Sequence, residues 1–276
     1  MASVEILLPV LNEQKVLESS VRTLHAYLTD NLKAHTWRIT IADNGSTDET
    51  FRIAQRLEAE LSDVTARHIP EAGRGRALSL GWLASDADVL AYMDIDLSTG
   101  FAAFPELVRR VVDGDDVVAG TRLGRGSDTK RSLKREVLSR GFVLLINTLF
   151  STRLRDTQCG FKAISRPAAR KLLPLVQDTG WFWDTELLLL ARKGGWNVSF
   201  VPVRWVEDTD SRVKIGKTVL RDLRGLLRMR GFDWSQAARG PSPSDEPESA
   251  TMPDRRTEAV RLAANLANDH GETHGN

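Results

Sequence analysis

The chain has 276 residues, and its 41% hydrophobic content is enough to bury the core of one large domain or of two smaller ones. Its 38 basic and 37 acidic residues leave a net charge of +1, which argues against a nucleic-acid partner. The single cysteine, Cys159, excludes an internal disulfide framework and fits a reducing cytosol. We recognise no signal peptide and no apolar run of about 20 residues, so we expect a protein that is soluble or peripheral to a membrane.

The first hundred residues alternate between patterns typical of buried strands and of amphipathic helices. Strands are expected at residues 4–10, 37–42, 64–69 and 88–93. Helices are expected at residues 13–32, 46–61 and 73–84. This alternation predicts an α/β fold with a Rossmann-like, doubly wound and mostly parallel sheet.

After residue 98 the pattern is less regular. Helices are expected at residues 104–112, 135–150, from about 167, 183–193 and 213–229. Strands are expected at residues 116–121, within 156–165, and at 196–205, and a long basic loop precedes the helix at 135–150. Residues 233–276 are rich in proline, serine and acidic residues, which predicts a disordered polar tail.

Asp94-Ile95-Asp96 directly follow the fourth expected strand. Open α/β folds bind ligands at the carboxyl edge of the sheet, where this strand delivers both carboxylates. Two carboxylates one residue apart repel each other and lose hydration, and a divalent cation relieves both effects. An oxygen-only site of this kind favours Mg²⁺ or Mn²⁺ shared with diphosphate oxygens. The competing interpretation is a solvated acidic turn, because such pairs are common in loops.

Further motifs connect the chain to a family. Residues 9–13 (PVLNE), 43–48 (DNGSTD), 75–77 (GRA) and 94–96 (DID) resemble, in this order, the nucleotide-sugar half of family 2 glycosyltransferases with the GT-A fold. Residues 156–162 (DTQCGFK) are similar to the signature of the polyprenyl-phosphate branch, the dolichyl-phosphate glucose and mannose synthases. Residues 183–186 and 205–208, with Ser211 and Arg212, resemble the same branch.

The resemblance implies an inverting transferase that moves a hexose, glucose or mannose, from a nucleotide diphosphate sugar such as UDP-glucose or GDP-mannose to polyprenyl phosphate. It also implies Mg²⁺ or Mn²⁺ as cofactor. The GT-A domain would span residues 1–232, with a nucleotide-sugar half at 1–98 and an acceptor half at 99–232.

The sequence departs from the family pattern in three places. Asn44 stands where relatives usually have the second of two adjacent carboxylates. Residues 73–76 read Gly-Arg-Gly-Arg where Gly-Lys-Gly is usual, so the cation changes and its charge does not. Many relatives continue into carboxyl-terminal transmembrane helices, which this sequence does not contain.

Residues at the ends of the first two strands are expected to bind the nucleotide. Pro9, Asn12, Glu13 and Asp43 would form a base and ribose pocket at the sheet edge. The alternative is that Pro9 and Asn12 merely end a strand.

The diphosphate is expected at the start of the helix that follows Gly73. Gly75 and Arg76 lie there, and a helix start is a natural place for phosphate. Asp94 would contact the same diphosphate through the cation. For Arg74, an ordinary solvated helix cap is an equal alternative.

The acceptor decides which further side chains are needed. A sugar hydroxyl requires a general base, whereas a lipid monophosphate is already ionised and needs cations that position it. Arg122 and Arg131, in the basic stretch 122–140, are expected to act on that phosphate during transfer. With the residues carried over from the resemblance, the expected acceptor site is Arg131, Arg135, Gln158, Lys162, Ser211 and Arg212. A flexible cationic surface loop is the alternative for the basic stretch.

Asp184 and Glu186 lie at the start of an expected helix within an aromatic-rich stretch. They could orient sugar hydroxyls, and Asp184 could supply the base if the acceptor were a hydroxyl. A helix-capping role for Asp184 competes with both interpretations.

Two stretches are suited to a membrane surface. Residues 137–150 are too short to cross a bilayer and apolar enough to lie in its interface, although a buried core helix fits equally well. Residues 219–229 alternate leucine with arginine, and a basic amphipathic helix can meet anionic headgroups. Trp181, Phe182 and Trp183 could line a lipid groove or pack in the core. We therefore expect a peripheral protein at the cytoplasmic face of a membrane.

The sequence thus favours hexose transfer to polyprenyl phosphate, with the catalytic residues Asp94, Asp96, Arg122, Arg131 and Asp184. The first alternative is a soluble glycosyltransferase that acts on a saccharide or small-molecule hydroxyl. The second is a non-catalytic module that binds a nucleotide sugar. Neither the sugar nor the nucleotide can be read from the residues, because their discrimination depends on the shape of the pocket.

Overall fold

The computed structural model describes residues 1–123, 126–130, 133–206 and 215–240. Met1–Arg239 form one compact unit. The expected boundary at residue 232 lies inside this unit, because Ala237 belongs to its core and accepts a hydrogen bond from Nε1 of Trp196 at 2.8 Å. Residues 241–276 of the expected polar tail lie outside the described residues.

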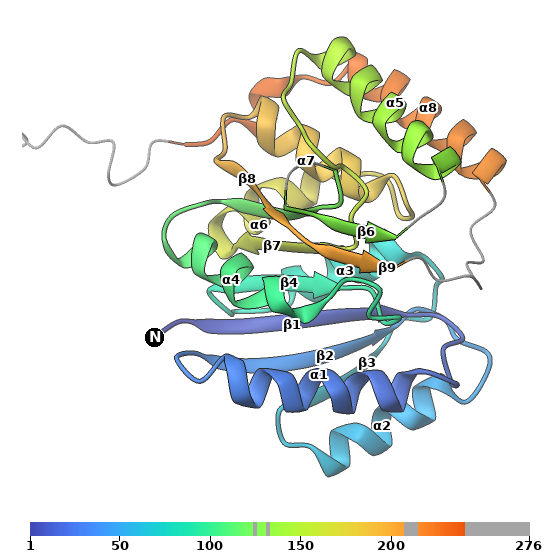
Figure 1. Ribbon diagram of the computed structural model, residues 1–276, viewed down its shortest axis with the longest axis vertical. Helices are drawn as coiled ribbons and strands as arrows, with labels where there is room; N and C mark the ends of the chain where they lie inside the picture. The colour runs from blue at the N-terminus through green and yellow to red at the C-terminus, as the bar shows by residue number, and fades with distance from the viewer. Residues whose placement is uncertain (124–125, 131–132, 207–214, 241–276) are drawn as a thin grey trace, which may run out of the picture. The chain divides into compact units, whose positions relative to one another are not determined.

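A seven-stranded sheet forms the centre of this unit, with the strand order β3-β2-β1-β4-β7-β5-β8 (Figure 1). Its strands are β1 (Ser3–Val10), β2 (Thr36–Asp43), β3 (Val64–His68), β4 (Val89–Met93), β5 (Val117–Thr121), β7 (Phe161–Ser165) and β8 (Val198–Pro202). Neighbouring strands pair in parallel except at β7, which runs antiparallel to both β4 and β5. The predicted α/β fold with a mostly parallel sheet is therefore confirmed.

Helices cover both faces of this sheet, and the residues of β1 show why. Leu7 packs into one hydrophobic cluster with residues of α3 and α7, whereas Ile6 and Leu8 pack into another with residues of α1, α2 and α4. Successive side chains of a strand point to opposite faces, so a fully buried strand needs a core on each side. The helices are α1 (Leu17–Asn31), α2 (Thr50–Glu60), α3 (Arg74–Leu83), α4 (Phe104–Val112), α5 (Leu133–Phe150), α6 (Arg166–Leu172), α7 (Trp183–Lys193) and α8 (Ile215–Arg230).

The described residues also form three short 3₁₀ helices: η1 (Phe101–Ala103), η2 (Leu173–Leu175) and η3 (Trp234–Ala237). The expected first helix begins later than residue 13. The N–H groups of Val16 and Leu17 both donate to the carbonyl oxygen of Glu13, so residues 13–16 form a turn that leads into α1.

The expected strand at 196–205 is in fact two strands in different sheets. β8 ends at Pro202, whose ring nitrogen has no hydrogen to donate, and Val203 N–H bonds to the carbonyl oxygen of Thr121 at 3.1 Å. The chain then continues as β9 (Arg204–Val206), which pairs in parallel with β6 (Asp128–Lys130). β6 lies in the stretch that we expected to be a loop.

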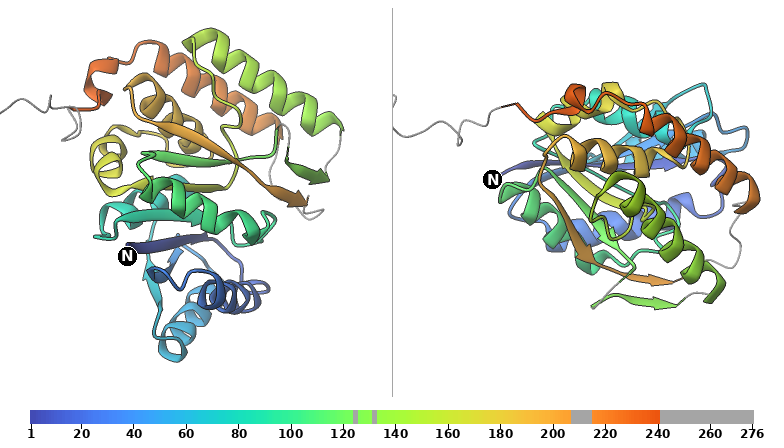
Figure 2. Two further views of the ribbon diagram at one scale, coloured as in Figure 1. Left: turned by 60° about the vertical axis from the view of Figure 1, so that its left-hand side comes forward. Right: turned by 90° about the horizontal axis from the view of Figure 1, so that it is seen from above.

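Helices α5 and α8 lie on the outer side of α7, away from the sheet (Figure 2). Each turns a few apolar side chains inward, with Ile146 and Phe150 of α5 and Leu226 and Met229 of α8 in the core. No helix within the described residues combines the length and the apolar character that a bilayer span requires.

Candidate active site

The turn that carries Asp94 and Asp96 follows β4 at the carboxyl edge of the sheet. The N–H of Leu97 donates to the carbonyl oxygen of Asp94 at 3.2 Å, and Leu97 has a φ of 52°, which L-residues other than asparagine and aspartate rarely adopt. Ile95 is buried. The turn therefore places a half-buried carboxylate, Asp94, and an exposed one, Asp96, on either side of an anchored side chain.

Gly160, in the signature 156–162, makes room for the Asp94 carboxylate. Its carbonyl oxygen accepts a hydrogen bond from the N–H of Asp94 at 3.1 Å. A β-carbon added to Gly160 would lie 1.7 Å from Oδ2 of Asp94, so no other residue fits without moving the carboxylate. The signature and the candidate metal site are thus one packed unit.

Arg74, the first residue of α3, bridges two carboxylates of the site. Its Nη2 and Nε lie 2.7 and 3.1 Å from Oδ1 of Asp94, and its Nη1 lies 2.7 Å from Oδ2 of Asp184. The guanidinium carbon also lies 5.0 Å from the ring centre of Tyr92 and 4.9 Å from that of Trp181. Burial opposes the charge of Arg74, but Asp94 and Asp184 outweigh it and raise its pKa. The solvated cap considered for Arg74 is therefore wrong.

Asp184 is buried and accepts hydrogen bonds from three side chains. The donors are Nζ of Lys162 at 2.8 Å, Nη1 of Arg74 and the hydroxyl of Tyr92. Burial alone would raise the pKa of this carboxyl, but the charges of Lys162 and Arg74 outweigh burial and lower it. Phe182 is the N-cap of α7, so Asp184 does not cap the helix. Asp184 is instead an ionised carboxylate inside a hydrogen-bonded network.

Lys162 lies beneath the site and does not line it. Its side chain is 0% exposed, and Nζ donates to the carbonyl oxygen of Cys159 at 2.6 Å as well as to Asp184. The strand register explains this position, because Lys162 of β7 pairs with Tyr92 of β4 and faces the same buried side. Direct contact between Lys162 and an acceptor is therefore not supported.

Arg122 follows β5 and is neutralised by Asp156 of the signature. Nε and Nη2 of Arg122 lie 2.8 and 3.0 Å from the two carboxylate oxygens, and the N–H of Arg122 donates to Oδ2 at 3.0 Å. Burial would raise the pKa of Asp156, but Arg122 outweighs burial and lowers that pKa to about 2. Arg122 is thus half of a buried bidentate pair, whereas we expected it to act on the acceptor phosphate.

Gln158 connects the signature to α8. Its Nε2 donates to Oδ2 of Asp222 at 2.8 Å, and Oδ1 of Asp222 is buried with no hydrogen-bond partner among the described residues. Burial raises the pKa of Asp222 to about 6. Nε2 of Gln158 is therefore engaged within the protein, and the acceptor contact expected of this residue stays a prediction.

Hydrogen bonds from two asparagine side chains join the loop after β1 to the loop after β2. Asn12 has a φ of 55°, and its Oδ1 accepts a hydrogen bond from the N–H of Thr47 at 2.8 Å. Asn44 donates through Nδ2 to the carbonyl oxygen of Val10 at 2.7 Å and accepts from the N–H of Gly73 at 3.1 Å. A carboxylate cannot make the first of these two bonds, which explains why an amide stands at position 44.

Asp43 is buried under the same loops. Its Oδ2 lies 2.7 Å from Nδ1 of His68, and its Oδ1 accepts from the N–H of Ser46 at 3.3 Å. Both oxygens are engaged inside the protein, so direct contact with a base or ribose is not supported. His68, at the end of β3, is exposed and stands between Asp43 and solvent.

Pro9 and Glu13 border these loops in different ways. Pro9 is a buried residue of β1 that pairs with Ala42, and so does not line an open pocket. The N–H of Glu13 donates to Oγ1 of Thr50 at 2.8 Å, which joins the start of the α1 segment to α2. Among the residues of the expected base pocket, Asn12 and Glu13 are half-buried, whereas Pro9 and Asp43 are buried.

The start of α3 is occupied by protein groups. The N–H groups of Gly75 and Arg76 both donate to the carbonyl oxygen of Thr179, at 3.0 and 3.3 Å, so they are not available as a phosphate cradle. A β-carbon on Gly75 would lie 2.6 Å from Cβ of Trp183, which shows that Gly75 allows α3 to approach α7. Arg76 pairs with Glu71 at the surface.

Some of the expected acceptor residues cannot be placed. Arg131, Ser211 and Arg212 lie outside the described residues. Arg135 lies in the first turn of α5, and its side chain is likewise outside the description. Their roles remain predictions from the sequence.

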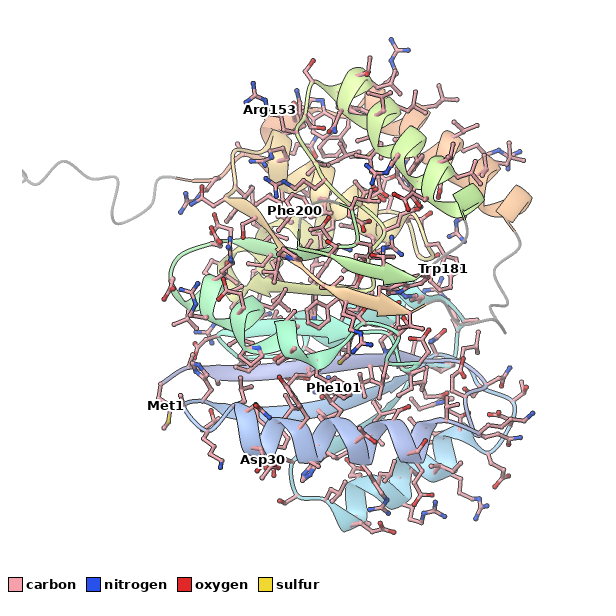
Figure 3. The ribbon with its side chains drawn as sticks, viewed as in Figure 1. Met1, Asp30, Phe101, Arg153, Trp181 and Phe200 are labelled. Carbon is pink, nitrogen blue, oxygen red and sulfur yellow. The ribbon has the colours of Figure 1, made fainter. Side chains whose placement is uncertain are left out.

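The aromatic stretch divides between core and surface. Phe182 and Trp183 are fully buried, so the lipid-groove interpretation is wrong for both, whereas Trp181 is 44% exposed. Trp181 lies on the side of the molecule where the parallel strands end (Figure 3). With Tyr92 it encloses the guanidinium of Arg74.

Sequence reasoning missed Tyr92 and His68 and gave Arg74 no role in the site. Tyr92 looked like one more apolar residue of a buried strand. Arg74 and Arg76 have the same charge and nearly the same neighbours, and nothing local distinguishes the arginine that points inward. A useful signal for His68 was its position at the end of a parallel strand, the edge at which such folds bind ligands.

The donor set fits a divalent cation that shares its coordination with a substrate. Asp94 and Asp96 offer hard carboxylate oxygens at the surface, and both hydrogen bonds from Arg74 go to Oδ1 of Asp94. Within the described residues, no group of three or more His, Cys, Asp or Glu side chains is placed to hold a metal on its own. Mg²⁺ and Mn²⁺ commonly take one or two carboxylates and complete their shell with phosphate oxygens and water.

Comparison with known proteins identifies the family. The sequence model described as glycosyl transferase family 2 matches residues 5–173. The glycosyltransferase AglD of Haloferax volcanii is 38% identical over 225 residues, which cover 81% of this chain and 35% of that protein. The dolichyl-phosphate beta-glucosyltransferase ALG5C of Trichomonas vaginalis is 32% identical over 219 residues, which cover 75% of this chain and 65% of that protein. The chain thus spans about a third of the length of the first relative and just under two thirds of the second.

A solved structure shows the same fold. Glucosyl-3-phosphoglycerate synthase from Mycobacterium tuberculosis, in complex with Mn²⁺, uridine diphosphate and phosphoglyceric acid, has a TM-score of 0.60 and 20% identity. The match covers 84% of this chain and 80% of that one. It confirms the expected GT-A fold, and the family match extends over more than half of the sequence. The chain belongs to glycosyltransferase family 2.

Proposed function

We propose that the chain is an inverting transferase that moves a hexose from a nucleotide diphosphate sugar to polyprenyl phosphate. The observation that carries the proposal is the packing of signature residue Gly160 against Asp94, which joins the polyprenyl-phosphate signature to the candidate metal site. The name of the Trichomonas relative supports a dolichyl-type phosphate as acceptor and glucose as the sugar. UDP-glucose is thus the first donor to test, and GDP-mannose the second.

Asp94 and Asp96 are the proposed ligands of Mg²⁺ or Mn²⁺. When bound, the cation supplies Lewis-acid stabilisation of the departing nucleoside diphosphate. Arg74 adds a fixed positive charge beside Asp94, held in place by Tyr92 and Trp181. Positive charge at this point reduces the repulsion between donor diphosphate and acceptor phosphate.

The reaction itself needs no general base. An ionised oxygen of the acceptor phosphate attacks the anomeric carbon, and the bond to the nucleoside diphosphate breaks with its electron pair on the leaving oxygen. Asp184, the base that a hydroxyl acceptor would require, is buried and already accepts from Lys162, Arg74 and Tyr92. This arrangement favours a phosphate acceptor over the hydroxyl-acceptor alternative.

The acceptor phosphate is proposed to bind Arg131, Arg135, Ser211 and Arg212, on the strength of the resemblance. Arg122 contributes indirectly, since its pairing with Asp156 positions the signature loop. Asn12, Asp43 and Asn44 shape the proposed nucleotide site through the hydrogen bonds that join its loops.

The lipid acceptor also requires a membrane surface. α5 exposes large apolar side chains, and so does α8, in which arginines alternate with them. The exposed apolar residues are Val137, Leu138, Leu144, Leu145 and Leu149 of α5 and Val219, Leu220, Leu223 and Leu227 of α8. We propose that these two faces rest on the cytoplasmic surface of a membrane, with their apolar side chains in the interface.

One assay tests the proposal. Purified protein is incubated with radiolabelled UDP-glucose or GDP-mannose, Mg²⁺ or Mn²⁺, and either polyprenyl phosphate or a panel of free sugars. Label that enters the organic phase only with polyprenyl phosphate is the expected result. Transfer to free sugars alone would establish the soluble hydroxyl-acceptor alternative. If neither transfer nor donor hydrolysis occurs under any of these conditions, the result would favour the non-catalytic module that binds a nucleotide sugar.

A further inference from the structure

A basic cavity of about 360 Å³ lies at the other end of α7 from Asp184. Its lining consists of Ser151, Thr152 and Arg153, which follow α5, and Arg192 and Lys193 in the last turn of α7. The helical rise places Lys193 about 14 Å along the axis from Asp184. Figure 3 shows Arg153 well away from Trp181, which marks the candidate active site. The cavity is therefore separate from the proposed catalytic centre.

The charge in this cavity is not balanced. No acidic side chain lines it, and within the described part of the chain none of its three cations pairs with a carboxylate. Nε of Arg192 is buried without a hydrogen-bond partner in that part of the chain, and its Nη2 reaches only the carbonyl oxygen of Val198, at 3.5 Å. The Arg192 guanidinium thus has no carboxylate of the described residues beside it to offset its charge, and an anion bound in the cavity would supply one.

The negative ends of two helix dipoles offset only part of the positive charge in this cavity. α5 and α7 both end near the cavity, and each helix carboxyl terminus carries roughly half a negative charge. Three cations against two such ends leave a surplus of about two positive charges. The surplus matches a phosphate group, which carries between one and two negative charges near neutral pH.

The loop that lines the cavity is held in one conformation. Oδ1 of Asn147 accepts from the Thr152 hydroxyl and from the N–H of Leu154, both at 2.9 Å, and its Nδ2 donates to the carbonyl oxygen of Leu154 at 2.9 Å. The N–H of Thr152 donates to the carbonyl oxygen of Asn147, and Ser151 has a φ of 52°. This is the geometry of a Schellman ending, for which glycine is usual. The backbone that carries Ser151 and Arg153 is thus held in place beside the cavity.

We propose that this basic cavity binds a phosphate group through Arg153, Arg192 and Lys193, with the hydroxyl of Ser151 as an additional partner. The ligand is either a small phosphorylated molecule or the headgroup of an anionic lipid. The site is independent of the proposed transfer reaction, and its occupation is measurable without turnover.

The test compares two double variants of the full chain. Arg153→Gln/Lys193→Gln removes two charges from the cavity and keeps the partly buried Arg192. Lys33→Gln/Lys171→Gln removes the same charge from exposed positions on other elements. Binding of inorganic phosphate and of glycerol 3-phosphate is measured by calorimetry. Retention on phosphatidylcholine vesicles with and without phosphatidic acid is measured by flotation. Circular dichroism confirms that both variants are folded.

We expect the cavity variant to lose at least tenfold in affinity for one of these phosphates, while the surface variant matches the wild type. Loss confined to the soluble phosphates identifies a small ligand, and loss confined to phosphatidic acid vesicles identifies a lipid headgroup. Equal binding by both variants in every arm would overturn the proposal. So would a wild-type protein that binds none of the probes.

Discussion

Nη1 of Arg74 lies 2.7 Å from Oδ2 of Asp184, while Nη2 of the same guanidinium lies 2.7 Å from Oδ1 of Asp94. One cation therefore joins the start of α3 to α7 and to the turn after β4. The side chain of Arg74 is 11% exposed, so these contacts form where water screens them weakly. The three side chains form one electrostatic unit, and a change in any of them changes the environment of the other two.

Replacement of Arg74 by methionine should impair both stability and transfer. Asp184 would lose one of its two cationic partners and Asp94 its guanidinium, and breaking such a buried pair typically costs about 3–5 kcal/mol. Arg74→Lys should be intermediate, because one ammonium cannot reproduce the fork that reaches both carboxylates. Urea unfolding and donor kcat/KM measure the two effects. Arg52→Met, at an exposed site of α2, is the control, and equal stability of the two methionine variants would contradict the bridging role.

Loss of the Asp96 carboxylate should abolish transfer and leave the fold intact. Asp96 is exposed, so Asp96→Ala should unfold at nearly the wild-type urea concentration while turnover falls by at least about 1,000-fold. Asp113→Ala, at the exposed end of α4, is the matched control. A chelator should have the same effect on the wild type, reversed by Mg²⁺ or Mn²⁺. Near-normal activity of Asp96→Ala, or undiminished transfer in chelator, would remove the metal from the mechanism.

Asp156→Asn should destabilise the protein in a pH-dependent way. The pKa of Asp156 is lowered to about 2 in the folded state, below its usual value of about 4. Its contribution to stability is therefore complete above about pH 4 and is lost as the pH falls towards 2. At pH 7 the variant should lose about 3–5 kcal/mol, because Arg122 is left buried without its counter-charge.

The matched control for Asp156 is Glu106→Gln. Glu106 also has its pKa lowered to about 2, by Arg109 and Arg110, but at an exposed site. Solvent screens that interaction, so the control should cost less than about 1 kcal/mol. Similar unfolding free energies for both variants at pH 7 would show that the Arg122–Asp156 pair has no special importance.

The sequence was sufficient for the parts of the fold that depend on local periodicity. The strands β1 and β4 are continuous apolar runs, and the helices α4 and α7 were predicted with their observed bounds. The separation of β8 from β9 and the existence of β6 depend on pairing between residues about 75 positions apart. A local pattern carries no information about such pairing, so these features were missed.

In the site, the sequence identified the residues at the strand ends better than their contacts. Asp94 and Asp184 were both expected to be catalytic residues. In the structure they bind the same guanidinium, but Arg74, which joins them, was not recognised. Successive residues of a helix are rotated by about 100°, so Arg74 and Arg76 point in nearly opposite directions from the start of α3. Lys162 was expected, from the resemblance, to bind the acceptor. Charged side chains are rarely buried, and only the tertiary structure places Asp184 beside its Nζ.

The buried carboxylate of Asp222 should make the free energy of unfolding fall as the pH rises from about 4 to about 6. Its pKa is raised to about 6 when folded, so across this window the folded state binds more protons than the unfolded state. Asp222→Asn should remove this dependence. As the pH rises from about 4 to about 6, the unfolding free energy of the variant should increase relative to that of the wild type by at most about 3 kcal/mol. Urea unfolding at a series of pH values measures this difference in unfolding free energy, with Asp30→Asn on α1 as the exposed control. Parallel curves for wild type and Asp222→Asn would contradict the buried, ionisable state of this group.

The exposed faces of α5 and α8 should determine binding to membranes. Leu144 and Leu227 are each 68% exposed, and burying one leucine in an apolar environment stabilises binding by about 1.5–3 kcal/mol. Leu144→Glu/Leu227→Glu should therefore weaken flotation with anionic vesicles at least tenfold. Val112→Glu on α4 should not, although Val112 is also exposed. Transfer to a short-chain, water-soluble polyprenyl phosphate analogue should be the same in all three proteins. If the leucine variant floats as well as the wild type, a different surface meets the membrane and the two helices face water.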